Sequence, residues 1–198
     1  MYNSWVEIDL NALRNNIATL KAGLSRNCRF LLPLKANAYG HGLEPIAKAA
    51  YEFGADWLGL ATAREALEIK SYVPDARILV LGPCEADDAK LLLVHQITPI
   101  IVDLENAKEM NDAAKRLGAK LPVHIKVDTG MGRIGFDADH CLEDIYAATD
   151  RIAASGIAFM PPPPDTYYER SHERVTGHRE PVDRMRKHGI LIDGEGVV

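Results

Sequence analysis

The sequence predicts an α/β fold, and within that class a parallel (β/α) barrel of the TIM type. Short apolar runs alternate along the chain with longer segments whose apolar residues recur at helical spacing. The runs lack a polar face, which is typical of parallel strands covered on both sides. The repeating units are evenly sized and no Gly-x-Gly-x-x-Gly follows the first buried strand, so a barrel is favoured over the alternative, a doubly wound open sheet.

The chain begins with a segment that differs from the repeating units. Residues 5–10 alternate between apolar and polar types, which predicts a half-buried strand. Asn11 is then expected to cap a helix that places Leu13, Ile17 and Leu20 on one face.

The repeating units begin at residue 29. Strands are expected at residues 29–34, 57–61, 77–81, 97–102 and 121–127, and helices at 43–53, 63–72, 86–95 and 105–117. A helix over 141–154 and strands at 156–160 and 189–193 are expected to continue the series. The run of four prolines at 161–164 fits neither a helix nor a central strand. We therefore expect residues 1–198 to form one barrel domain that is incomplete or irregular after about residue 160, with 161–198 an atypical tail.

Composition excludes several functional classes. The 198 residues carry 23 Lys and Arg against 28 Asp and Glu, a net charge of −5, which offers no basic surface for nucleic acid. The longest apolar runs are far too short to span a membrane. Cys28, Cys84 and Cys141 show neither a metal-binding spacing nor a Cys-x-x-Cys pair. We expect a cytoplasmic protein that binds no metal, nucleic acid or membrane.

The first stretch with candidate catalytic or binding residues is 33–42, which reads Pro-Leu-Lys-Ala-Asn-Ala-Tyr-Gly-His-Gly. Lys35 follows a hydrophobic strand, and the carboxyl ends of barrel strands form the catalytic rim. A partly desolvated lysine there can act as a Schiff-base nucleophile or carry a proton. The glycines on either side of His41 allow the backbone to approach a ligand closely. The alternative is an ordinary solvated lysine at a strand end.

The second stretch is residues 124–135, which read His-Ile-Lys-Val-Asp-Thr-Gly-Met-Gly-Arg-Ile-Gly. Lys126 lies within an apolar alternation, where an unpaired cation is costly, so it needs a partner, a modification or a neutral form. Arg133 emerges from a glycine-rich turn, and its planar fork suits phosphate, carboxylate or phenolate oxygens. The alternative is a surface arginine on a tight turn.

These two stretches, together with residues 5–9, resemble the signatures of the alanine racemase family. The resemblance covers roughly residues 4–157 and implies a (β/α)8 barrel followed by a separate β-rich domain, in a homodimeric isomerase of D-alanine biosynthesis. It implies that Lys35 links to pyridoxal 5'-phosphate as a Schiff base and acts as the base for one enantiomer. Tyr39 would bind the cofactor phosphate, and Arg133 would contact both the cofactor and the substrate carboxylate. Lys126 matches a position that carries a carbamate in many members.

The chain departs from the family in its later part. The β-rich domain that supplies the second base, a tyrosine from the partner subunit, has no counterpart here, and Phe159, Met160 and Pro161 stand where the family has a Thr-His-Phe segment. Three explanations are compatible with this pattern. The chain is a fragment, it is a diverged short relative, or the sequence of its tail is given incorrectly.

Two functions follow from these observations. The first is a racemase that interconverts L- and D-alanine, or the barrel part of one, and the alternative is a barrel protein that binds pyridoxal phosphate without catalysis. Because only one of two bases is recognised, we expect the chain alone to racemise alanine weakly or not at all. The loss of one general acid–base group typically lowers the rate by a factor on the order of 10²–10⁴.

Overall fold

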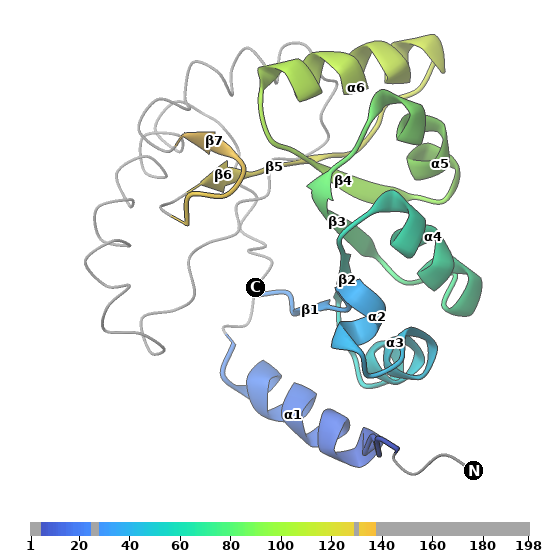
Figure 1. Ribbon diagram of the computed structural model, residues 1–198, viewed down its shortest axis with the longest axis vertical. Coiled ribbons are helices and arrows are strands. Elements are labelled where there is room, and N and C mark those ends of the chain that lie inside the picture. The colour runs from blue at the N-terminus through green and yellow to red at the C-terminus, as the bar shows by residue number, and fades with distance from the viewer. Residues whose placement is uncertain (1–4, 25–27, 129–130, 138–198) are drawn as a thin grey trace.

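The computed structural model describes residues 5–24, 28–128 and 131–137, and it places a parallel sheet at the centre (Figure 1). The strands of this sheet, in the spatial order β1-β2-β3-β4-β5, are β1 (Leu31–Pro33), β2 (Trp57–Leu60), β3 (Ile78–Pro83), β4 (Ile97–Ile101) and β5 (His124–Ile125). Because the spatial order follows the chain order, every crossover adds its strand at the same growing edge. This order distinguishes a barrel from a doubly wound sheet, in which the order reverses. A second sheet pairs β6 (Val127–Asp128) with β7 (Phe136–Asp137).

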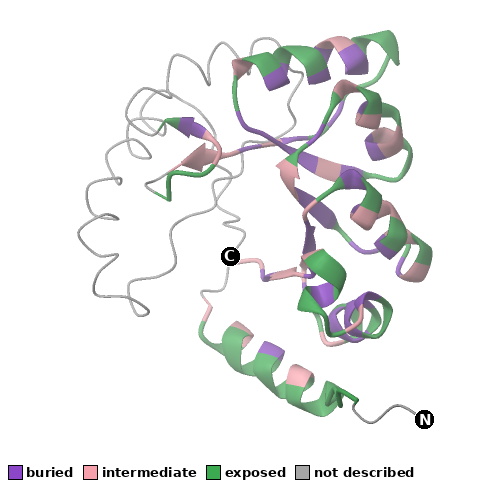
Figure 2. Cartoon of the chain, in the orientation of Figure 1, coloured by how far each residue is buried: buried purple, intermediate pink, exposed green. Residues whose placement is uncertain are grey.

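The helices follow their strands and lie along one side of the sheet (Figure 1). They are α3 (Leu43–Glu52), α4 (Ala63–Tyr72), the short 3-10 helix η1 (Ala86–Asp88), α5 (Ala89–Val94) and α6 (Leu104–Arg116), with α1 (Leu10–Ala22) preceding the first strand. Figure 2 shows buried residues where these helices face the sheet and exposed residues on their outer faces. This amphipathic pattern is the physical reason that the helical spacing was readable in the sequence.

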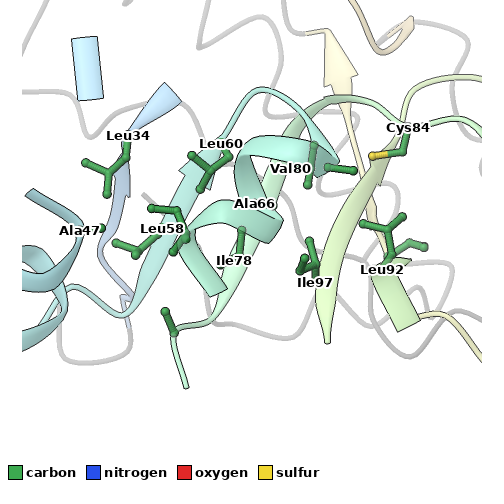
Figure 3. Close-up of a cluster of buried hydrophobic side chains, with 14 of the residues drawn as sticks. Leu34, Ala47, Leu58, Leu60, Ala66, Ile78, Val80, Cys84, Leu92 and Ile97 are labelled. Carbon is green, nitrogen blue, oxygen red and sulfur yellow. The ribbon is translucent and has the colours of Figure 1, made fainter. Parts of the chain in front are cut away.

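The outer hydrophobic layer fills the space between the sheet and the helices (Figure 3). Leu58 and Leu60 of β2 point toward the helices, where they meet Ala47 of α3 and Ala66 of α4 in one buried cluster. Small alanines on the helices let them approach the sheet closely, which gives the dense packing of a protein interior.

The inner hydrophobic layer lies on the opposite face of the same strands. Its buried members are Leu31, Leu79, Ile100 and Val102, with Trp57, Leu81 and Ile134 packed against them. A Cβ on Gly59 would lie 2.9 Å from the side chains of both Leu31 and Leu81. The absence of a side chain at this position therefore lets β1 and β3 meet across β2.

The sheet curls strongly about this inner layer. Trp57 and His124 belong to β2 and β5, between which β3 and β4 intervene, yet their ring centroids are 5.7 Å apart. In a flat sheet, three strand spacings of about 4.8 Å would hold those backbones about 14 Å apart. Curvature of this kind is what a closing barrel requires, so the predicted (β/α) barrel class is confirmed.

The elements predicted between residues 29 and 117 are confirmed in type and order. The helix predicted over 63–72 coincides with α4, and the others differ by one or two residues at their ends. The helix predicted over 86–95 is divided into η1 and α5. The strand predicted over 121–127 is also divided, because β5 pairs with β4 and β6 pairs with β7.

The prediction for the first segment is wrong. Residues 5–9 form no strand, and no strand of the described residues pairs with them, so Trp5 and Val6 are exposed. The helix cap is Asp9, whose carboxylate accepts hydrogen bonds from the backbone of Asn11 and Ala12. Asn11 lies inside the helix instead. Ile17 is fully buried as expected, whereas Leu20, the third residue of the predicted apolar face, is exposed.

The predictions for residues 141–198, including the tail that begins with the proline run, fall outside the described residues. In the described part of the chain, no helix is both long and apolar enough to cross a membrane.

The half-buried imidazole of His124 predicts a specific pH dependence of stability. Burial lowers the pKa of His124 from its ordinary 6.5 to about 4. As the pH falls from 6.5 toward 4, the unfolded chain binds a proton that the folded chain does not, and stability present above pH 6.5 is lost. The loss amounts to at most about 3.5 kcal/mol, at about 1.4 kcal/mol per pKa unit.

Urea unfolding of His124→Phe should show a weaker loss of stability over this pH range than the wild type. His95→Phe, at an exposed position, should keep the wild-type dependence. An unchanged pH dependence in His124→Phe would show that another group is responsible.

Candidate active site

Lys35 lies at the carboxyl end of β1, as predicted, and is half-buried. The strand ends in a hydrogen bond from the backbone N–H of Leu34 to the carbonyl of Gly59, at 2.7 Å. The chain then enters α2 (Lys35–Tyr39) without an intervening loop. The lysine is thus held at the rim of the sheet by the last bond between β1 and β2.

The segment after Lys35 is a turn of left-handed helix. Ala36, Asn37, Ala38 and Tyr39 have φ angles between 52° and 56°, although none of them is a glycine. A left-handed conformation costs about 1–2 kcal/mol for each such residue. Strain of this size persists only where the surroundings enforce it, and it is concentrated at functional sites.

Local contacts supply part of that enforcement. The side-chain carbonyl of Asn37 accepts a hydrogen bond from the backbone N–H of Leu43 at 2.7 Å, which ties the turn to the start of α3. His41 Nδ1 donates to the carbonyl of Ala38 at 2.8 Å. The Ala38 side chain is buried, whereas Tyr39 projects from the turn with 58% of its surface exposed. Lys35 and Tyr39 therefore belong to one rigid turn at the rim.

Glu65 makes a further contact that the sequence analysis missed. Its carboxylate accepts a hydrogen bond from the backbone N–H of Ala36 at 2.9 Å and another from that of Ala61 at 2.8 Å. Thr62 caps α4 by accepting from the Glu65 backbone N–H. The order Thr-x-x-Glu is the signature of a capping box, and it was the signal available in the sequence.

Lys126 lies where the two sheets meet. Its backbone N–H donates to Ile101 of β4, and its carbonyl accepts from Phe136 of β7, both at 2.9 Å. The side chain is half-buried. Desolvation lowers the pKa of Lys126, the positive charge of Arg133 lowers it further, and Asp128 partly offsets both. These surroundings disfavour the charged form of Lys126, so the expectation that it needs a partner, a modification or a neutral form stays a prediction.

Arg133 is carried by a turn that Asp128 organises. The two carboxylate oxygens of Asp128 accept hydrogen bonds from the backbone of Gly132 at 3.0 Å and of Arg133 at 2.7 Å. The Arg133 residue itself is exposed. The structure thus brings Arg133 into the electrostatic environment of Lys126.

The predicted residues form two groups at the same edge of the sheet. Lys35 and Tyr39 follow the carboxyl end of β1, and Lys126 and Arg133 follow that of β5. The strands between them are parallel, so both groups lie at the carboxyl ends, where barrel enzymes place their active sites. An amine, a phenol and a guanidinium at one rim can bind an aldehyde and anionic groups.

Other chemistry finds less support in the described part of the chain. Burial, assisted by the charge of Asp88, raises the pKa of the Cys84 thiol to about 12, so this thiol is a poor nucleophile. No group of three or more His, Cys, Asp or Glu side chains gathers there in a way that would hold a metal ion.

Comparison with known proteins identifies the family. The profile of the family described as "Alanine racemase, N-terminal domain" matches residues 8–188. This chain belongs to the alanine racemase family. It is 44% identical over 159 residues to the alanine racemase of Symbiobacterium thermophilum, a match that covers 79% of this chain and 42% of that protein. It is 40% identical over 191 residues to alanine racemase 2 of Caldanaerobacter subterraneus, which covers 94% of this chain and 49% of that protein.

Solved structures of alanine racemases share the fold. The enzyme of Clostridium difficile superimposes with a TM-score of 0.83 at 28% identity, over 97% of this chain and 54% of that one. The Bacillus anthracis enzyme with bound L-Ala-P gives a TM-score of 0.81 at 26% identity, over 96% of this chain and 50% of that one. The chain therefore spans about half the length of these relatives.

The turn that carries Arg133 predicts a difference between two of its glycines. A Cβ on Gly135 would lie 2.8 Å from the backbone nitrogen of Asp128 and 2.9 Å from the carbonyl of Lys126, whereas one on Gly132 would meet nothing within 4 Å. Both glycines have positive φ, so alanine at either is strained by about 1–2 kcal/mol. We expect Gly135→Ala to lose a further 1–3 kcal/mol, roughly the cost of overpacking. Chemical denaturation measures both, and equal losses would contradict the close approach.

Proposed function

We propose that this chain forms the lysine-bearing part of a pyridoxal-phosphate-dependent alanine racemase, which interconverts L- and D-alanine. The observation that carries the proposal is the placement of Lys35 at the start of a strained turn, which hydrogen bonds hold at the carboxyl edge of a barrel sheet. Membership of the alanine racemase family supports the reaction class. Since the chain spans about half of its relatives, the activity of the whole protein is part of this proposal.

The residues at the rim fit pyridoxal phosphate. Lys35 offers a primary amine, which the cofactor aldehyde requires, and it is half-buried rather than free in solvent. The exposed side chain of Tyr39 extends from the same turn, and its hydroxyl would donate a hydrogen bond to the cofactor phosphate. Arg133 would lie beside the phenolic oxygen of the cofactor and the carboxylate of the substrate.

Lys35 would act as the base on one face of the amino acid. When bound, pyridoxal phosphate acidifies the Cα–H bond of an amino acid and delocalises the resulting charge. The Lys35 amine would accept that proton, and Arg133 would fix the substrate carboxylate so that Cα faces the lysine. Inversion requires a second base on the opposite face, which we propose a partner subunit in a homodimer supplies. The three cysteines are scattered along the sequence without a Cys-x-x-Cys pair, which supports the proposal of a reducing cytoplasmic location.

Replacement of Lys35 tests the cofactor linkage. Lys35→Ala should abolish the visible absorbance of the lysine-bound cofactor and the covalent adduct that borohydride fixes, because the amine that forms the linkage is removed. The fold should survive, since Lys35 lies outside the hydrophobic layers. Lys90→Ala, an exposed lysine on α5, should keep both signals, and the same samples can be assayed for D-alanine formation. A chromophore that persists in Lys35→Ala would assign the linkage to another lysine.

We propose further that Lys126 carries a carbamate. Its lowered pKa favours the neutral amine, which is the form that reacts with carbon dioxide, and the resulting anion would pair with Arg133. In bicarbonate buffer, native mass spectrometry should detect the added mass of one carbamate, and mild acid should remove it. Lys126→Gln should lose the added mass, and Lys120→Gln, at an exposed position, should keep it. A wild-type chain without the adduct would refute the modification.

A further inference from the structure

The junction between β1 and β2 lacks two hydrogen bonds that a regular parallel ladder would form. With Pro33 opposite Gly59, the N–H of Ala61 would donate to the carbonyl of Leu34, and the N–H of Ala36 to that of Ala61. The Leu34 carbonyl instead accepts from Ala38, at 2.8 Å, because β1 leaves the sheet and enters the left-handed turn. The turn therefore removes the ladder partners of two backbone donors at the rim.

The carboxylate of Glu65 replaces both missing partners. Oε1 accepts from Ala36 at 2.9 Å and Oε2 accepts from Ala61 at 2.8 Å. Glu65 is half-buried in the first turn of α4, where the helix dipole favours a negative charge. One side chain thus bridges two strands at the point where their backbones diverge.

This contact differs from an ordinary helix cap. In a capping box the glutamate accepts from the N–H of its own cap residue, which here is Thr62. Glu65 instead reaches the residue before the cap and a residue 29 positions earlier in the chain. A contact that served only to begin α4 would need no bond to Ala36.

The bond to Ala36 fixes the backbone next to Lys35. On one side of the lysine, the N–H of Leu34 is bonded to Gly59 of β2. On the other side, the N–H of Ala36 is bonded through Glu65 to the end of β2. Lys35 is therefore held to the second strand at both neighbouring residues. This limits the directions that its side chain can take from the rim.

We propose that Glu65 is a positioning residue for Lys35, acting through the backbone amides of Ala36 and Ala61. The proposal rests on the proposed function insofar as Lys35 is the cofactor lysine. Its physical content is a carboxylate that stands in for two ladder bonds and so holds the strained turn against β2.

Three variants of the full chain test this role. In Glu65→Gln, the single amide oxygen can accept a hydrogen bond from only one of the two backbone N–H groups. The NH2 group of the glutamine then faces the other N–H, and that hydrogen bond is lost. Glu65→Asp keeps the charge and helix cap but shortens the side chain by one methylene, which provides a second variant if the first is unstable. Glu68→Gln, the matched control, removes the same charge one turn later on α4, where the side chain contacts Tyr72.

Two readouts are needed, and the first requires no cofactor. Amide hydrogen exchange of Ala36 and Ala61, measured by NMR, should become about tenfold faster or more in both Glu65 variants, as expected for the loss of a charge-assisted hydrogen bond. The amide of Leu58, in the middle of β2, should be unchanged. The second readout is the rate at which added pyridoxal phosphate links to Lys35, followed by visible absorbance, which should fall by a similar factor of about ten.

The control Glu68→Gln should leave both rates close to those of the wild type. Unchanged exchange at Ala36 and Ala61 in the Glu65 variants would overturn the proposal, and so would faster exchange with an unchanged linking rate. If the wild-type chain forms no linkage at all, the proposed function fails, and amide exchange alone then decides whether Glu65 holds the turn.

Discussion

Packing on the inner face of the sheet determines the geometry on which the candidate site depends. Leu31, Leu79 and Ile100 come from three different strands and meet in one buried cluster, and Trp57 reaches His124 across two intervening strands. These contacts form only if the sheet curls. Curling in turn gathers the carboxyl ends of β1 and β5 toward one rim, although these strands lie at opposite edges of the described sheet. The candidate site residues follow the carboxyl ends of these two strands.

At the rim, side-chain hydrogen bonds hold a strained stretch of backbone in place. The left-handed turn after Lys35 is unfavourable for alanine and tyrosine, so contacts with α3, through Asn37, and with β2, through Glu65, must hold it in place. A lysine on a flexible loop would lose conformational entropy each time it engaged a ligand. A lysine on a fixed turn has already lost much of this conformational entropy during folding. The second group follows the same logic, since Asp128 shapes the turn that carries Arg133.

Much of the fold was predictable because each unit carries its own local pattern. The apolar spacing within α4 and the continuous apolar runs of β2 and β4 identify these elements without tertiary information. Residues 5–9 show the limit of this reasoning, because an alternating pattern describes a strand only where another strand is available for pairing. Leu20 shows the same limit on a helix, since spacing identifies a face but not how far the covering core extends.

For the candidate site, the sequence indicated candidate residues more readily than how they are held. Lys35, Lys126 and Arg133 are candidates from motifs and strand ends, and Tyr39 is a candidate from the family resemblance. The left-handed turn was not, because Ala-Asn-Ala-Tyr contains no glycine to indicate positive φ angles. Glu65 was also overlooked, since its bond to Ala36 joins distant parts of the chain and exists only in the folded state.

The most direct test of the account is proton exchange at Cα of alanine in D2O. The chain would be incubated with pyridoxal phosphate and each alanine enantiomer separately, and the loss of the Cα proton would be followed by NMR. Because the proposal places Lys35 on one side of the substrate, exchange should be faster for one enantiomer and should outpace racemisation, and Lys35→Ala should abolish it. Equal exchange of both enantiomers, or exchange that survives in Lys35→Ala, would contradict the assignment of Lys35 as the base.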